Sequence, residues 1–297
     1  MTNSRPHILM CPPDHYGIEY EINPWMNRRR QADHELATKQ WNDLVAILRD
    51  LQVELSFLTP QEGLPDLVFT ANAGVVFRRQ IVLSQFRFPE RQPEQAVDQK
   101  WFESNGFRVA TLSPGLDFEG AGDALFCGGT LFAGYRIRSD ARGHQEVGEI
   151  LSCRVIPMEL VDPYYYHLDT CFCPLNENTA IYLPKAFDRY GRQVLKQFIP
   201  NLLEVDPSEA KDFACNAVVV GQNVITNVGC PKLRQQLTHQ GFKPIATPLS
   251  EFVKAGGSAK CLTLRLDGEE AATWKRNKNG RVVAVDNSAV SRTPLDD

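Results

Sequence analysis

The 297-residue sequence contains no apolar run of the roughly 20 residues that a membrane-spanning helix needs. Its first residues, MTNSRPHILMCPPDHYG, lack the basic segment and the long apolar core of a secretory signal. Positive charge is not in excess, because 32 Lys and Arg face 36 Asp and Glu and the net charge is -4. This balance argues against a strongly basic surface for nucleic acid or anionic membranes. We therefore expect a soluble, cytoplasmic protein.

Spacings that mark metal, redox and nucleotide sites are missing as well. The eight cysteines include no C-x-x-C pair, and Cys171 and Cys173 beside His167 have no second Cys or His pair at zinc-finger spacing. No G-x-G-x-x-G or G-x-x-x-x-G-K-[ST] motif opens a helix, which argues against a doubly wound nucleotide-binding fold. The cysteines lie mostly among apolar residues, as free thiols do. We expect no metal and a reducing compartment.

What the sequence does contain is a repeated order of predicted elements. DALFCGGTLFAGY reads as a hairpin, and it is followed by a helix near 141–151 and by the strand CRVIPM. The same order begins with the predicted strand DLVFTANAGVVF, residues 66–77, and recurs in the hairpins HLDTCFCPLNENTAIYLP and ACNAVVVGQNVITNVG. A last candidate, AKCLTLRL, has no helix after it, but the N-terminus supplies the strand HILMCPP, the helix ELATKQWNDLVAILRDLQ and the strand VELSFL. These are about five units of roughly 35–50 residues, the range of repeat architectures.

Five such units favour closure into a ring in which the N-terminus completes the last unit. We predict an α/β fold, a five-bladed pseudo-symmetric α/β propeller of ββαβ-type units around a central site. An open mixed α/β sheet with coincidental spacing is the alternative. We predict one catalytic domain over residues 1–270, and residues 271–297 as a polar C-terminal tail or the stump of a linker.

Polar residues inside otherwise apolar strand segments mark the candidate chemistry. His167 and Asp169 begin a predicted strand and would share one face of it, a pairing that suits a base beside a cationic substrate. Cys261 follows GGSAK at the start of the predicted strand CLTLRL, where a thiol with a lowered pKa could act as a nucleophile. Each residue also has a purely structural interpretation. His167 could cap a loop, and Cys261 could be one more buried cysteine.

Two further carboxylates, Glu119 and Asp123, stand beside glycines in DFEGAGDALF. They form a sensible lining for a guanidinium or an amine, although two surface acids in a turn would look the same.

Taken in order, PDLVFTANAG, FEGAGDAL, HLDTCF and GGSAKCLTL resemble the guanidine-modifying enzymes of the pentein superfamily. That group contains arginine deiminases, dimethylarginine dimethylaminohydrolases and amidinotransferases, and the resemblance covers residues 7–268. ILMCPPDHYGIEYEINPWM and FEGAGDALF are most similar to the arginine dihydrolase domain of cyanobacterial ornithine-ammonia cycle enzymes. There the domain is fused to a longer C-terminal region.

The resemblance implies a role for each matched residue. Cys261 matches the nucleophile, His167 the general acid/base, and Glu119 the carboxylate that contacts the guanidinium and assists proton transfer. The substrate-binding positions that it implies are Asn23, Phe69, Asn72, Arg87, Asp123, Arg138 and Asp169. Asp169 is the second guanidinium-binding acid, and Arg87 and Arg138 lie where related enzymes hold the substrate carboxylate.

Two departures from the family pattern stand out. EGAGD has one residue more than the deiminase EGGD, which affects the placement of Glu119 relative to Asp123. Asn72 stands where deiminases carry Asp in an FTRD-like segment. An amide offers donors as well as an acceptor, so Asn72 is predicted to retain a neutral ureido intermediate for a second hydrolysis.

The expected function is therefore an arginine dihydrolase. It hydrolyses the guanidinium carbon of L-arginine through a covalent Cys261 intermediate and gives ornithine, two ammonia and carbon dioxide, without a cofactor. The expected partner is this small-molecule substrate, with no nucleic acid and no membrane, and a homo-oligomer is left open. The alternatives are an arginine deiminase or dimethylarginine dimethylaminohydrolase that releases citrulline, an amidinotransferase, and a ribosome-binding pentein without catalysis.

Overall fold

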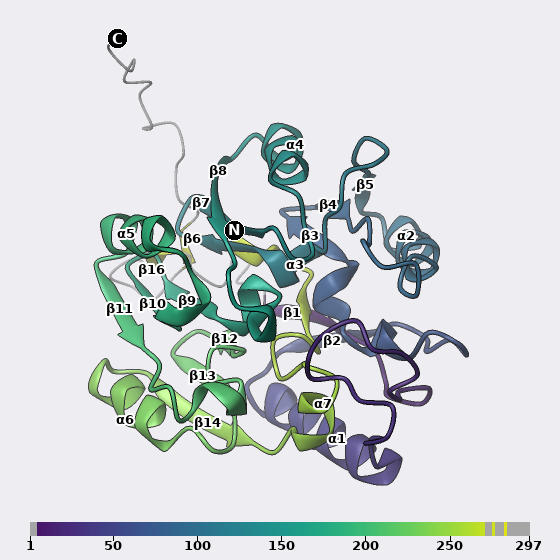
Figure 1. The fold of residues 1–297 in the computed structure, drawn as a ribbon, viewed down its shortest axis with the longest axis horizontal. Helices are drawn as coiled ribbons and strands as arrows, with labels where there is room; N and C mark the ends of the chain where they lie inside the picture. Colours follow the sequence, from purple (N-terminus) through teal and green to yellow (C-terminus); the bar gives the residue numbers. More distant parts are fainter. Residues whose placement is uncertain (1–4, 271–274, 277–281, 284–297) are drawn as a thin grey trace.

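Five three-stranded sheets form the fold, and each repeats one order of elements. The computed structural model describes residues 5–270, 275–276 and 282–283. In each sheet the first two strands are antiparallel, and a helix then leads to a third strand that pairs in parallel with the second. The helices lie on the outside and the sheets face the middle of the molecule (Figure 1). The predicted five-unit α/β propeller is confirmed.

Four units are continuous in the chain, and we number them in sequence order. Unit 1 comprises β3 (Gly74–Phe77), β4 (Gln80–Leu83), α2 (Glu94–Ser104) and β5 (Arg108–Ala110). Unit 2 comprises β6 (Ala124–Cys127), β7 (Thr130–Tyr135), α4 (Ala141–Leu151) and β8 (Arg154–Glu159). Unit 3 comprises β9 (Phe172–Asn176), β10 (Thr179–Tyr182), α5 (Arg189–Phe198) and β11 (Asn201–Glu204). Unit 4 comprises β12 (Val218–Val220), β13 (Asn223–Asn227), α6 (Pro231–His239) and β14 (Lys243–Thr247).

Unit 5 joins the two ends of the domain. It comprises β15 (Leu264–Arg265), β1 (His7–Met10), α1 (His34–Asp50) and β2 (Glu54–Phe57). Ile8 pairs with Arg265 in the antiparallel register, and β1 pairs in parallel with β2. The N-terminus therefore completes the last unit and closes the ring, as predicted.

The packing explains why the apolar positions recur as they do. On α1, Asp33 accepts a hydrogen bond from the backbone N–H of Leu36 at 3.0 Å and caps the helix. The apolar side chains of α1 fall at helical spacing and are buried against the sheet of unit 5, namely Ala37, Trp41, Leu44, Val45 and Leu48. Other clusters of core side chains span neighbouring units, so the units are stabilised by contact with one another.

The segments just before the first strand of units 1, 3 and 5 differ from the prediction. Residues 66–77 were expected to form one strand, but 3₁₀ helices η1 (Pro65–Val68) and η2 (Thr70–Ala73) precede β3. His167 and Asp169 were expected to begin a strand, but they flank Leu168 at the start of the 3₁₀ helix η4 (Leu168–Thr170), and β9 begins only at Phe172. Cys261 was expected to start a strand, but it lies in a turn. These three predictions were wrong.

The cause is the same in each case. A short run of buried apolar residues does not distinguish a strand from a buried turn by its periodicity. In the turn before β9, Thr170 donates from both its backbone N–H and its hydroxyl to the carbonyl of His167, at 3.2 and 2.6 Å. Such local bonds compete with extended backbone, and here they prevail.

The predicted tail, residues 271–297, lies outside the described residues apart from the strand pair β16 (Lys275–Arg276) and β17 (Val282–Val283). Glu269 and Glu270, at the predicted boundary, are buried. Within the described ranges no helix has both the length and the apolar character that crossing a membrane requires.

Candidate active site

The segments that precede the first strand of each unit contact one another. The backbone N–H of Ala71, before β3, donates to the carbonyl of Cys261, before β15, at 3.1 Å. The N–H of Leu168, before β9, donates to Oδ1 of Asp123, before β6, at 3.0 Å. The predicted site residues therefore converge because each unit presents the same part of its repeat to the centre.

Cys261 is held between a carboxylate and an amide. Its Sγ lies 3.2 Å from Oδ2 of Asp169, and Nδ2 of Asn216 donates to the same sulfur at 3.1 Å. Burial, and next the charge of Asp169, raise the pKa of the Cys261 thiol well above its ordinary value. Burial also raises the pKa of Asp169 to about 7, although the charge of Lys260 opposes this. Without substrate the sulfur is therefore a neutral thiol that donates to Asp169.

His167 and Glu119 form a second buried pair. Nε2 of His167 lies 2.7 Å from Oε2 of Glu119, and Nη1 of Arg138 donates to the same oxygen at 2.8 Å. Burial would raise the pKa of Glu119, but Arg138 and His167 outweigh it and lower that pKa to about 2. Burial lowers the pKa of His167 to about 4 despite the neighbouring carboxylate. An ionised carboxylate only accepts, so neutral His167 carries its proton on Nε2 and keeps the Nδ1 lone pair for a proton.

Asn72 is fixed by contacts on both ends of its amide. Nη1 of Arg91 donates to its Oδ1 at 2.9 Å, and its Nδ2 donates to the backbone carbonyl of Glu119 at 3.2 Å. Arg91 is itself held by Glu94 through two hydrogen bonds of 2.9 and 2.8 Å. Because Arg91 occupies the oxygen of its amide, Asn72 presents N–H groups, and not an acceptor, to the segment around Glu119.

Asp123 is fully buried and joins the loops that carry Ser139 and Leu168. Its Oδ2 accepts from the Ser139 hydroxyl at 2.7 Å while its Oδ1 accepts from Leu168. Burial raises the pKa of Asp123 well above its ordinary value. Both oxygens are thus used within the protein, whereas Glu119 and Asp169 each have one oxygen without a hydrogen-bond partner among the described residues.

Two predicted substrate-binding residues border the glycine turn that leads to Cys261. Asn23 donates from Nδ2 to the carbonyl of Ala255 at 3.0 Å. Phe69 packs its ring edge-to-face on Tyr16, with centroids 5.9 Å apart, and lies so close to Gly257 that any side chain there would overlap it.

The two predicted arginines differ in their surroundings. Arg138 is buried between the rings of Phe88 and Tyr166, with its guanidinium carbon 4.8 and 4.5 Å from their centroids. Arg87 is partly exposed and bonds to the carbonyls of Arg136 and Ile137 and to the carboxylate of Asp117. None of these three partners of Arg87 is a predicted site residue.

Sequence reasoning missed Arg91 and Asn216. Arg91 lies in FRFPERQPEQ, which is typical of an exposed loop, and its spacing of three to Glu94 was the only sign of an internal ion pair. Asn216 could have been found from the repeat, because it precedes the hairpin of unit 4 as the other site residues precede theirs.

Gly122→Ala is expected to lower kcat by about 100-fold, the scale of a misplaced reacting group. A Cβ at Gly122 would overlap Nδ2 of Asn72 and lie 3.2 Å from Nδ1 of His167. Steady-state ammonia release from arginine measures the effect. Gly17→Ala is the control, because the nearest atom to its Cβ, Oε1 of Gln31, is 4.0 Å away. A wild-type kcat for Gly122→Ala would show that turnover does not depend on the positions of Asn72 and His167 beside Gly122.

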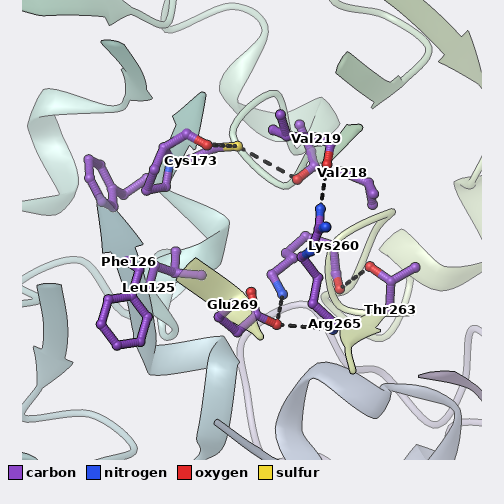
Figure 2. Close-up of a pocket in the computed structure, with 12 residues that line it drawn as sticks. Leu125, Phe126, Cys173, Val218, Val219, Lys260, Thr263, Arg265 and Glu269 are labelled. Atoms are coloured by element: carbon purple, nitrogen blue, oxygen red, sulfur yellow. Dashed lines mark hydrogen bonds and ion pairs between the residues drawn. The ribbon is translucent and has the colours of Figure 1, made fainter. Parts of the chain in front are cut away.

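A small cavity lies beside this group of residues, between β6, β9, β12 and β15 (Figure 2). Its volume is about 40 Å³. Lys260, the neighbour of Cys261, pairs there with Glu269 at 2.9 Å. Over the described residues, no group of three or more His, Cys, Asp or Glu side chains is arranged to hold a metal ion.

Comparison with known proteins places this fold among the guanidine-modifying penteins. A family model described as N,N dimethylarginine dimethylhydrolase, eukaryotic, matches residues 16–267. The chain belongs to this family.

The relatives include enzymes of two kinds. The bifunctional arginine dihydrolase/ornithine cyclodeaminase ArgZ of Synechocystis sp. is 46% identical over 264 residues, which cover 87% of this chain and 37% of ArgZ. The N(G),N(G)-dimethylarginine dimethylaminohydrolase of Mycobacterium tuberculosis is 38% identical over 257 residues, covering 86% of this chain and 84% of that protein. This chain thus spans little more than a third of the length of ArgZ.

A solved structure of the N-terminal domain of ArgZ superimposes with a TM-score of 0.85 at 44% identity. The match covers 88% of this chain and 98% of that one. It is described as an arginine dihydrolase from the ornithine-ammonia cycle in cyanobacteria, in a cysteine-to-serine variant bound to substrate.

Proposed function

We propose that the protein is an arginine dihydrolase with Cys261 as its nucleophile. The observation that supports the substrate class is a pair of buried acids with unused acceptors. Among the described residues, Oε1 of Glu119 and Oδ1 of Asp169 have no hydrogen-bond partner. Buried acceptors are rarely left unpaired, and a planar guanidinium carries enough N–H donors to satisfy both carboxylates at once.

In the first cycle, the guanidinium binds between Glu119 and Asp169, and its charge favours the thiolate of Cys261. The thiolate attacks the guanidinium carbon, and the thiol proton passes to neutral His167. His167 gives that proton to the departing nitrogen, which leaves as ammonia, and an amidino group remains on the sulfur. Water activated by His167 then displaces the sulfur, giving citrulline and the free thiol.

In the second cycle, Cys261 attacks the ureido carbon of citrulline while Asn72 donates a hydrogen bond to the ureido oxygen. A second ammonia leaves and a carbamoyl group remains on the sulfur. Water releases this group as a carbamate, which breaks down to ornithine and carbon dioxide. Together the two cycles consume one arginine and two waters.

The similarity to the ArgZ N-terminal domain, over nearly its full length, supports this assignment. The second candidate is dimethylarginine hydrolysis, favoured by the family model and by the match to the mycobacterial enzyme. The two candidate functions are distinguished by incubating the protein with L-arginine and, separately, with dimethylarginine. Ornithine with two ammonia per arginine supports the dihydrolase. Citrulline and dimethylamine from dimethylarginine, with arginine unchanged, would replace it by the second candidate.

The pH dependence of kcat/KM is expected to show an acid limb with a midpoint of about 7, because Asp169 must be ionised to hold the guanidinium and burial raises its pKa to about 7. Below that pH, kcat/KM falls about tenfold per unit as the carboxylate is protonated. Lys260 lowers this pKa, so Lys260→Met should move the limb to higher pH. Lys254→Met removes the pairing with Glu251 and a bond to the carbonyl of Gln31, neither of which involves Asp169, and is the control. An unmoved limb in Lys260→Met would contradict the assignment to Asp169.

We also propose a reducing compartment, the cytosol, for this reaction. All eight cysteines are free thiols. Burial raises the pKa of several of them, for example Cys127 to about 12, which leaves them unreactive. The proposed chemistry requires Cys261 in the reduced state.

A further inference from the structure

Asn216 occupies in unit 4 the place that site residues occupy in the other units. Asn72 lies two residues before β3, Asp123 directly before β6, and Cys261 three residues before β15. Asn216 lies two residues before β12. The pseudo-symmetry of the ring therefore brings a residue of unit 4 to the centre as well, and its side chain is fully buried there.

The amide of Asn216 is completely used, and its orientation is determined by the backbone. Its Oδ1 accepts from the backbone N–H of Cys261 at 3.1 Å, and an NH₂ group could not do this. The NH₂ must therefore be the end that faces the sulfur at 3.1 Å and the carbonyl of Asp169 at 3.1 Å. The sulfur thus faces a donor on Asn216 and an acceptor on Asp169.

We propose that Asn216 is a positioning residue for the nucleophile: it holds Cys261 by backbone and sulfur together and donates a hydrogen bond to the thiolate. This inference rests on the proposed role of Cys261. A neutral thiol bonded to Asp169 gains little from a second donor, whereas a thiolate gains more because hydrogen bonds to charged groups are stronger. Asn216 therefore favours the attacking form over the resting form.

The ionisable groups that act on Cys261 come from the segment before β9. Asp169 raises its pKa, and the bond from Asn216 lowers it. Tyr166 also lies near the sulfur, but burial raises the pKa of its phenol well above the ordinary value, so it stays neutral. Its hydroxyl donates to the carbonyl of Gly256 at 2.8 Å. Among Asp169, Tyr166 and Asn216, only Asn216 stabilises the thiolate through a hydrogen bond from a neutral side chain, so its removal weakens the thiolate without removing a charge.

The test is alkylation of Cys261 by iodoacetamide without substrate, followed by mass spectrometry of the Cys261 peptide between pH 7 and 9. Well below the thiol pKa, the rate is proportional to the thiolate fraction. Asn216→Ser is expected to slow alkylation about tenfold, equivalent to a thiol pKa about one unit higher, and Asn216→Asp, which also brings a carboxylate to the sulfur, is expected to slow it further. Asn227→Asp is the matched control, because Asn227 is also buried and bridges two loops, through Leu249 and Asp212, without touching Cys261.

The direction of the change separates positioning from a merely structural role. Loosening of the turn would expose the sulfur and speed alkylation, so an equal or faster rate in folded Asn216→Ser overturns the proposal. If Asn216→Asp does not fold, judged by circular dichroism, Asn216→Ser decides alone. Protection of wild-type Cys261 by arginine tests the proposed nucleophile separately, and a lack of protection would count against that role rather than against the contacts of Asn216.

Discussion

Cys261→Ser is expected to lose more than about 10³-fold in kcat with arginine while the fold and substrate binding remain. A serine hydroxyl has almost no ionised fraction at neutral pH, and the carboxylate beside the sulfur, Asp169, has a pKa of only about 7 and is too weak a base to deprotonate it. The two acids proposed to hold the guanidinium are untouched by the change. Ammonia release measures turnover, and calorimetric titration with arginine measures binding.

Cys230→Ser is the control for this substitution. Cys230 is also buried, but it stands at the N-terminal cap of α6, where serine is a favoured residue. Its turnover should stay near that of the wild type. Substantial turnover by Cys261→Ser would remove Cys261 from the mechanism.

Asn72→Asp is expected to shift the product from ornithine toward citrulline, with ammonia per arginine falling from about two toward one. The new carboxylate keeps the contact with Arg91, so the fold should be retained. It has no N–H to give to a ureido oxygen, and it meets the carbonyl of Glu119, to which Asn72 now donates. Loss of one such donor in a preorganised site costs about 3 kcal/mol, or about 100-fold in the second cycle.

The product ratio is measured by amino-acid analysis at full conversion of arginine. Asn178→Asp, in the exposed turn between β9 and β10, makes the same chemical change away from the site and should leave the ratio unaltered. A folded and active Asn72→Asp enzyme with an unchanged ratio would leave Asn72 as a structural residue held by Arg91.

The repeat was predictable because each hairpin and helix has a strong local pattern. The helix at 141–151 and the turns near Gly128 and Asn223 depend on spacing and turn chemistry that neighbours in the sequence determine. The segments around His167 and Cys261 were not, because local turn hydrogen bonds and hydrogen bonds to other units together determine their backbone. The bond from Ala71 to the carbonyl of Cys261 joins residues that are far apart in the chain.

The candidate site shows the same division. Cys261, His167 and Glu119 were indicated by motif order, and the structure brings their segments together. Arg91 and Asn216 are buried polar residues. The spacing of Arg91 to Glu94 and the place of Asn216 before its hairpin were the signals that the sequence offered, and their contacts with Asn72 and Cys261 required the structure.

Closure of the ring by β1 and β15 has a consequence for how the enzyme is made on the ribosome. Strand β1 is synthesised early, yet its antiparallel partner lies at Leu264 and Arg265. Roughly 200 residues are translated between β2 and β15, which takes roughly 10–40 s at about 5–20 residues per second. During that time one edge of the sheet of unit 5 stays unpaired, and such an edge is prone to aggregation until β15 arrives. The thiol at Cys261 meets its acid and its amide only when the segment before β15 docks, so the proposed nucleophile is in place only after the ring has closed.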